Sequence, residues 1–156
     1  MTDNIPLSLE KYLLLLVSEL ELNEKNNCKM IKLIIDATKD KIFFMVINNH
    51  NNYYITHENT KKNFEKIMIL ISEFLESKNI KIKDISKLYV NKGPGSFAGI
   101  RNSLSTVQAI HFANNIDYYC FSLKDFQETN NIKYENIPEL CDKFKIKKNL
   151  INPIYL

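Results

Sequence analysis

The chain has 156 residues, of which 45% are hydrophobic and 25% are charged, and these proportions fit a single globular domain. The formal net charge is only +3, and all but one of the 21 basic residues are lysines spread along the chain, so the composition shows no footprint of nucleic-acid binding. The three cysteines, Cys28, Cys120 and Cys141, form no CxxC pair. This spacing indicates reduced thiols in a cytoplasmic protein and argues against a metal site.

The first patterned segment is the leucine-rich stretch at residues 6–22. Glu10 and Glu19 interrupt the apolar run, and Asp3 precedes it where a signal peptide carries basic residues, so we predict neither a membrane span nor a signal peptide. Apolar residues recur at three- and four-residue steps. This pattern predicts an amphipathic helix capped by Ser8, with its apolar face buried against another element.

Residues 23–29 are polar and are predicted to form a linker. The pattern then changes from helical to strand-like. Short β-rich runs follow at residues 31–35, 42–47 and 53–57, and polar turns join them. These runs predict an antiparallel meander of three strands.

Helices and strands alternate in the rest of the chain. Residues 64–77 predict a helix whose apolar positions cover more than one core-facing stripe, so we expect one side of it to meet a second surface. The later predicted elements are a strand at 88–91, a helix at 96–113, a strand at 118–121, a helix start with Ser122 and Asp125 as a capping box, a helix at 138–144 and an extended segment at 149–156. This order predicts an α/β fold.

The segment GPGSFAGIR, residues 93–101, contains all three glycines of the chain and its only arginine. Its Gly-Pro-Gly predicts a tight turn after a strand, and Ser96 can cap the next helix. Such a loop can bind an anion through free backbone amides, or it can be a turn that only packs closely. The absence of GxGxxG or GxxxxGK[ST] spacing favours the turn. The motif residues are Gly93, Pro94, Gly95, Ser96, Phe97, Gly99 and Arg101.

The helix after this loop has two distinguishable faces when its residues are placed 100° apart. One face is apolar and comprises Phe97, Ile100, Leu104 and Val107. The other face carries the small side chains of Gly99, Ser103, Thr106 and Ala113. Small residues allow another helix to approach closely. That helix belongs either to a partner chain or to residues 64–77 of the same domain, and the sequence fits both.

GPGSFAGIR resembles the GPGSFTG-[IV]-R motif of the TsaB family, which also follows a strand and opens a helix, and only Ala98 departs from it. Residues 31–38 (IKLIIDAT) are similar to the family's opening strand, which ends in Asp-Thr-Ser. Residues 63–65 fall where the family has His-Ser-Glu, and residues 152–156 (NPIYL) resemble its closing Pro-Val-Tyr-Leu-Arg. The resemblance covers residues 30–126, with an isolated match at the C-terminus.

The resemblance implies a half domain of the actin and sugar-kinase-like (ASKHA) fold, a mixed sheet flanked by helices, with an extra N-terminal helix. It also implies a non-catalytic subunit that forms a heterodimer with a TsaD-like protein, which carries the metal and the transfer chemistry of tRNA threonylcarbamoyladenosine synthesis. Contact with a TsaE-like ATPase and with tRNA is expected only through that complex. Self-association is the alternative without the partner, and no cofactor or membrane contact is expected.

The family's second half, about as long as its first, is almost absent from this sequence. We therefore divide the chain into a helical extension and linker (1–29), a TsaB-like N-terminal domain (30–126) and a short remnant tail (127–156). Residues 1–29 either cover the exposed sheet face or precede the true start, since Met30 stands where the family begins. In the superfamily a nucleotide binds between the two halves. The resemblance therefore argues against ATP hydrolysis here.

Asp36 matches the aspartate that active superfamily members use near the metal and the phosphates. A structural role at the strand end is favoured, because no second half supplies further ligands. The three histidines form no HxxxH pair, so no metal site is predicted. Ser96 lies outside a GxSxG elbow, so no catalytic residue is assigned.

The predicted partner interface is formed by the helices at 64–77 and 96–113, because large apolar residues left exposed beyond the core dominate binding. The nominated interface residues are Phe64, Ile67, Ile71, Ile100, Leu104 and Val107. Two other functions fit the sequence. One is a degenerate nucleotide-binding phosphotransferase that uses Asp36 and the glycine loop, and the other is a small tRNA-binding module that uses the lysines of residues 143–148.

Overall fold

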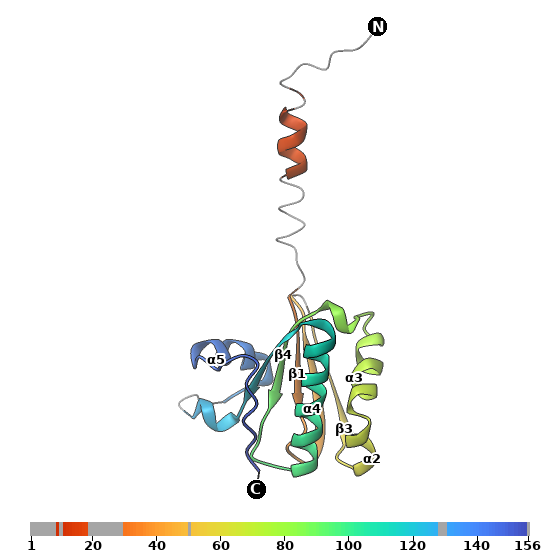
Figure 1. Ribbon diagram of the computed structural model, residues 1–156, viewed down its shortest axis with the longest axis vertical. Coiled ribbons are helices and arrows are strands. Elements are labelled where there is room, and N and C mark those ends of the chain that lie inside the picture. Colours follow the sequence, from red (N-terminus) through yellow and green to blue (C-terminus); the bar gives the residue numbers. More distant parts are fainter. Residues whose placement is uncertain (1–8, 10, 19–29, 50, 128–130, 156) are drawn as a thin grey trace.

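The computed structural model describes residues 9, 11–18, 30–49, 51–127 and 131–155. Within these residues, five strands form one sheet in the order β3-β2-β1-β4-β5 (Figure 1). The strands are β1 (Ile31–Asp36), β2 (Lys41–Ile47), β3 (Asn52–Glu58), β4 (Ile85–Asn91) and β5 (Asp117–Phe121).

The sheet is mixed. Strands β1, β2 and β3 pair antiparallel in sequence order, so the predicted meander is confirmed. Strands β4 and β5 run parallel to β1, which brings the carboxyl ends of these three strands to one edge of the sheet. The central strand β1 is apolar on both faces because elements cover the sheet from both sides, and the predicted α/β class is confirmed.

One face of the sheet is covered by α2 (Lys61–Glu65), α3 (Ile67–Glu76) and α4 (Phe97–Asn114) (Figure 1). The sequence predicted one helix over residues 64–77, but two are present, because Lys66 leaves the helical region at φ −110° and ψ 11°. A 3-10 turn, η1 (Ile82–Asp84), leads from α3 into β4. Helix α4 is capped by Ser96 as predicted and ends at Asn115, which adopts the left-handed conformation.

The larger hydrophobic cluster lies between these helices and the sheet. Alternate residues of the strands point into it, so β1 contributes Ile31, Leu33 and Ile35. The helices contribute buried residues at three- and four-residue steps, such as Ile67, Ile71 and Phe74 of α3. The inward-facing residues of the strands and of the helices thus form one continuous core.

The second face of the sheet is covered by C-terminal elements. These are η2 (Leu123–Phe126), η3 (Tyr134–Asn136) and α5 (Ile137–Lys143), which lie across the sheet from α3 and α4 (Figure 1). The predicted Ser122–Asp125 capping box is present, although the turn it starts is a 3-10 helix. Buried residues of β1, β4 and α5, including Ile34, Tyr89 and Leu140, form the second cluster.

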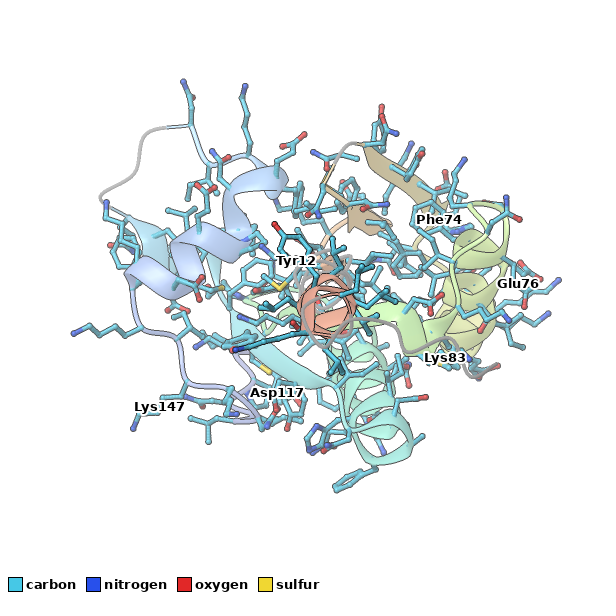
Figure 2. All side chains as sticks on the ribbon, turned by 90° about the horizontal axis from the view of Figure 1, so that it is seen from above. Tyr12, Phe74, Glu76, Lys83, Asp117 and Lys147 are labelled. Atoms are coloured by element: carbon cyan, nitrogen blue, oxygen red, sulfur yellow. The ribbon has the colours of Figure 1, made fainter. Side chains whose placement is uncertain are left out.

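Residues 11–18 are helical, within the predicted N-terminal helix, whereas its cap Ser8 lies outside the described residues. Within this chain, the described apolar side chains of the helix are not buried. Large apolar residues from Leu9 to Val17 are 46–71% exposed. Viewed end-on in Figure 2, the helix shows Tyr12 pointing away from the helix axis. Within the described ranges, no helix combines the length and apolar content that crossing a membrane needs.

Candidate functional site

The candidate site lies where the parallel strands β1 and β4 end, the usual ligand-binding edge of α/β sheets. Asp36 is the last residue of β1, and Asn91 is the last residue of β4. The glycine loop follows Asn91 and leads into α4. The fold therefore brings two predicted features, the strand-end acid and the glycine motif, to one edge of the sheet.

Asp36 is only 2% exposed, and four hydrogen bonds surround its carboxylate. One oxygen, Oδ1, accepts from the backbone N–H of Thr38 at 2.9 Å and from its hydroxyl at 2.7 Å. The other oxygen, Oδ2, accepts from the Asn91 side-chain amide at 2.9 Å and from the Tyr134 hydroxyl at 2.6 Å. The carboxylate is thus satisfied by the chain itself.

The bond to Tyr134 joins residues that are 98 positions apart and could not be read from the sequence. Tyr134 also stacks on Phe43 with the ring centroids 4.2 Å apart. Burial, and then the neighbouring Asp36 carboxylate, raise the pKa of Tyr134, so its hydroxyl remains a donor at neutral pH. Asp36 therefore fastens the C-terminal part of the chain to the end of β1.

The glycine loop packs against backbone on two sides. Gly93 has a φ of +109°, which favours glycine, and a Cβ there would collide with the carbonyl of Ile154. A Cβ on Gly99 would collide with the carbonyl of Ala37 and press on the ring of Phe64. Close approach of the backbone accounts for these two glycines without any ligand.

Several amides that an anion would need are already bonded within the chain. The N–H of Gly93 donates to the Asn91 side-chain oxygen at 3.0 Å, and the N–H of Ser96 donates to the Thr38 carbonyl at 2.9 Å. The N–H of Gly99 donates to the Ser96 hydroxyl at 3.3 Å. The geometry supports the structural turn, which was the favoured of the two interpretations.

The open space beside the loop is small. A crevice of about 170 Å³ is lined by the loop and by residues after β1 and β5, with Lys39 and Lys124 among them. Pockets for small ligands usually measure about 300–1,000 Å³. Lys92 lies nearby, but its ammonium pairs with Asp125 at 3.3 Å. The crevice is too small to enclose a nucleotide.

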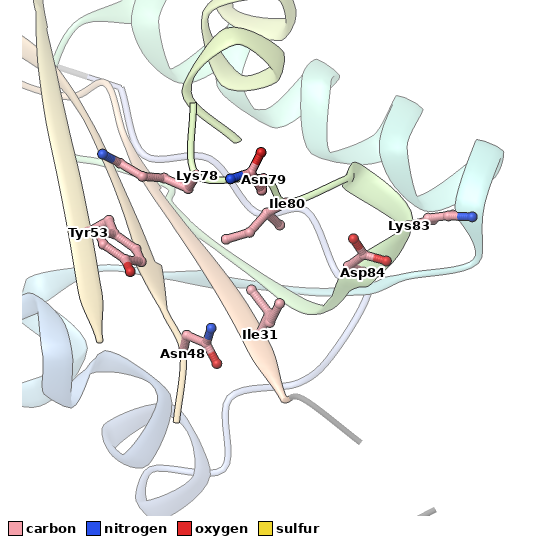
Figure 3. Close-up of a pocket in the computed structure, with 8 residues that line it drawn as sticks. All are labelled: Ile31, Asn48, Tyr53, Lys78, Asn79, Ile80, Lys83 and Asp84. Carbon is pink, nitrogen blue, oxygen red and sulfur yellow. The ribbon is translucent and has the colours of Figure 1, made fainter. Parts of the chain in front are cut away.

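A larger cavity of about 570 Å³ lies near the amino end of β1, away from the motif (Figure 3). Ile31 and Ile80 contribute its apolar wall, and Asn48, Tyr53 and Lys78 add polar groups. The Lys78 ammonium sits 5.2 Å from the centre of the Tyr53 ring. No residue of the glycine motif lines this cavity, and no sequence pattern predicted it. Elsewhere in the described ranges, no three His, Cys, Asp or Glu side chains gather as metal ligands would.

The six residues nominated for the interface lie in the core instead. Each is at most 7% exposed, because each points from its helix toward the sheet. The buried six are Phe64, Ile67, Ile71, Ile100, Leu104 and Val107. Periodicity identified the apolar side of each helix correctly, but that side packs on the sheet, which leaves these residues little surface for a partner.

The accessible side of the same helices is mostly formed by other residues, although two of the nominated six, Phe64 and Ile67, also line the groove there. A groove of about 230 Å³ runs between α2–α3 and α4, with the small residues Ser105, Thr106 and Ala109 on its α4 side. Met68 lines the other side and is 39% exposed, and the adjacent Ile69 is 53% exposed. On α4, Gly99 packs on Phe64 of α2, so the close helix approach predicted from small residues is made within the domain at this position.

The family model described as "TsaD: tRNA N6-adenosine threonylcarbamoyltransferase" matches residues 22–124. The chain belongs to this family. Two curated relatives, both named tRNA threonylcarbamoyladenosine biosynthesis protein TsaB, are similar to this chain, so the predicted resemblance is confirmed.

The first relative, from Buchnera aphidicola subsp. Schizaphis graminum, is 29% identical over 92 residues, which cover 59% of this chain and 44% of the relative. The second, from Buchnera aphidicola subsp. Baizongia pistaciae, is 29% identical over 73 residues, which cover 41% of this chain and 33% of the relative. The chain thus spans less than half the length of these relatives.

The structure of YeaZ from Pseudomonas aeruginosa superposes with a TM-score of 0.55 at 15% identity, over 59% of this chain and 43% of that protein. At this identity the likeness shows the fold alone. Together with the family match, it confirms the ASKHA-like fold predicted from the sequence.

Proposed function

We propose that this chain is a non-catalytic partner subunit in tRNA threonylcarbamoyladenosine biosynthesis, which dimerises with a TsaD-type enzyme and stabilises it. The observation that carries the proposal is a contrast within the fold. At the strand-end site, internal hydrogen bonds already satisfy Asp36 and the loop amides. On the outer side of the helices, a groove is open.

The strand-end geometry supports the absence of catalysis. A carboxylate that binds a metal needs free lone pairs, whereas both oxygens of Asp36 each accept two hydrogen bonds. To recruit Asp36, a metal would have to displace Thr38, Asn91 or Tyr134. The phosphotransferase alternative therefore has no observation in its favour.

The groove between α2–α3 and α4 supports a helical partner. Its α4 side carries Ser105, Thr106 and Ala109, whose short side chains let the backbone of a second helix approach. Met68 supplies an adaptable apolar contact on the other side. A helix that presents bulky apolar side chains fits such a groove. We assign this role to a helix of the TsaD-type enzyme, or to a second copy of this chain when the enzyme is absent.

The rest of the assembly follows from this role. A TsaE-like ATPase and tRNA would contact the enzyme and reach this subunit only through the complex. The proposed site of action is the cytoplasm, where tRNA is modified. No nucleotide or metal is required by this chain.

The test is co-expression with the TsaD protein of the same organism, purification through a tag on TsaD, and measurement of the complex mass by light scattering. We expect a one-to-one heterodimer. Met68→Asp and Ala109→Arg should each weaken it at least tenfold, because they place charge or bulk in the groove. Tyr54→Asp is the control, since Tyr54 is a large exposed side chain on β3, 68% exposed, outside the groove.

The proposal fails if TsaD is recovered alone from cells that contain soluble chain. It also fails if Tyr54→Asp weakens the complex as much as the two groove variants do. Binding of ATP to the isolated chain, measured by calorimetry, would favour the phosphotransferase instead. Ile71→Asp and Leu104→Asp are unsuitable as interface variants, because both residues are at most 4% exposed and a charge there would unfold the domain.

A further inference from the structure

We call the C-terminal residues 148–155 the strap. Its first anchor is the outer edge of β5, the last strand of the sheet. The backbone N–H of Asn149 donates to the Tyr118 carbonyl at 2.8 Å, and the Tyr118 N–H donates to the Asn149 side-chain oxygen at 3.0 Å. The Asn149 amide also donates to Asp117 at 2.7 Å. Asn149 thus forms hydrogen bonds with both the backbone and a side chain of the edge strand.

The second anchor is the glycine loop. The N–H of Ile154 donates to the Lys92 carbonyl at 2.8 Å, and Tyr155 forms a parallel bridge with Gly95. The ring of Tyr155 packs on Phe97 with the centroids 4.7 Å apart. The Ile154 carbonyl occupies the space that a side chain on residue 93 would fill. The motif glycine therefore accommodates the backbone of the strap.

The strap as a whole buries little apolar surface. Leu150 is 51% exposed, Ile154 is 36% exposed and Tyr155 is 44% exposed, and only Ile151 packs on the large core. The Lys148–Asp117 ion pair is solvent-exposed, with its side chains 61% and 36% exposed, so it adds little. Ordering eight residues costs conformational entropy. The main-chain hydrogen bonds and the side chains of Asn149 and Tyr155 must therefore offset most of this cost.

We propose that the free edge of β5 and the glycine loop form a binding site for an extended peptide, and that the chain's own strap is its occupant. The site binds main chain in the manner of strand addition. At the first anchor the site recognises an asparagine. At the second anchor, Phe97 contacts an aromatic side chain that lies six positions after this asparagine in the peptide. Because the strap buries so little apolar surface, it belongs to the part of the molecule that opens locally. The site is then free for the same sequence supplied in trans.

This inference goes beyond the partner-subunit function and does not depend on it. The groove between α2–α3 and α4 and the strap site share no residue, since the strap contacts the start of α4 and the edge of β5. The two proposals can therefore fail separately.

The test uses the full chain and a fluorescein-labelled peptide with the sequence of residues 147–155. The double variant Asn149→Ala, Tyr155→Ala weakens the strap in place and should bind the peptide, as measured by anisotropy. Wild-type chain should bind it at least tenfold more weakly, because the native strap competes. Lys147→Ala is the matched control, since its side chain makes no hydrogen bond or ion pair with the described residues, and it should behave like wild type.

A peptide in which the same Asn and Tyr are replaced by alanine should not bind the double variant. The proposal is overturned if the authentic peptide fails to bind a double variant whose circular dichroism and urea midpoint match the wild type. Hydrogen exchange of the wild-type chain provides a second test, which needs no variant. The amides of Asn149 and Ile154 should exchange at least 100-fold faster than those of Leu88 and Val90 in β4, and equal protection would contradict an opening strap.

Discussion

Tyr89 and Tyr134 both lie on the second face of the sheet, but only one of them has a bonded hydroxyl. The Tyr134 hydroxyl donates to Asp36, whereas the Tyr89 hydroxyl has no hydrogen-bond partner among the described residues. Burial, followed by the nearby Asp142 carboxylate, raises the pKa of Tyr89, so its hydroxyl stays neutral at physiological pH. An unpaired buried hydroxyl costs stability, while a bond to a carboxylate contributes it.

Removing the two hydroxyl groups should therefore have different effects on stability. Tyr134→Phe should lower the free energy of unfolding by about 1.5–3 kcal/mol, because it removes a bond to a charged acceptor. Tyr89→Phe should leave it unchanged or raise it by about 1 kcal/mol, because no protein bond is lost. Urea unfolding at pH 7 measures both, and each variant is the control for the other. Equal losses would contradict the assignment.

At the scale of elements, α4 shows how a glycine can be required inside a helix. Gly99 lies in the first turn and is buried against the carbonyl of Ala37 and the ring of Phe64. Helix propensity alone favours alanine at such a position by about 1 kcal/mol. The close approach of α4 to the end of β1 outweighs that preference, since a methyl group there would push the helix away from the sheet.

Gly99→Ala should thus destabilise the domain by about 1–3 kcal/mol, in the manner of an overpacked core, despite the gain in propensity. Ser105→Ala, on the exposed side of the same helix, should change stability by no more than about 0.5 kcal/mol. Thermal unfolding of the two variants beside wild type measures the difference. If Gly99→Ala were as stable as Ser105→Ala, close packing would not explain the glycine.

At the scale of the whole molecule, one sheet is shared by two hydrophobic clusters. Cys120 belongs to the cluster under α4, and Cys141 belongs to the cluster under α5. Burial raises the pKa of each thiol to about 12, with carboxylates near Cys141 adding to the effect. Because the clusters share strands, we expect the two faces to unfold in one transition, and both thiols then contribute to the same pH dependence.

Stability should consequently fall as the pH rises from about 9 toward 12. In this window the unfolded chain releases thiol protons that the folded chain keeps, so the unfolded state gains free energy of ionisation. Urea unfolding at pH 7.5 and pH 10.5 measures the slope. The double variant Cys120→Ala, Cys141→Ala should be less stable at both values but lose less on going to pH 10.5. An identical loss in variant and wild type would assign the slope to other groups.

Local patterns were enough for much of this fold. The period-two runs at β1, β2 and β3, the Ser96 cap and the Ser122–Asp125 box depend on neighbours in the chain, so the sequence alone determined them. The family resemblance likewise rested on short contiguous segments, chiefly GPGSFAGIR at residues 93–101. The break at Lys66 was not visible, because no glycine or proline marks it.

Only the tertiary structure decided which side of each helix meets the sheet and what fills the strand-end site. Ile71 and Leu104 looked available for a partner, because periodicity defines an apolar side but not what covers it. The contacts of Asp36 with Tyr134 and of Gly93 with Ile154 join residues 98 and 61 positions apart. Such contacts depend on how the sheet brings distant segments together, and no local preference encodes them.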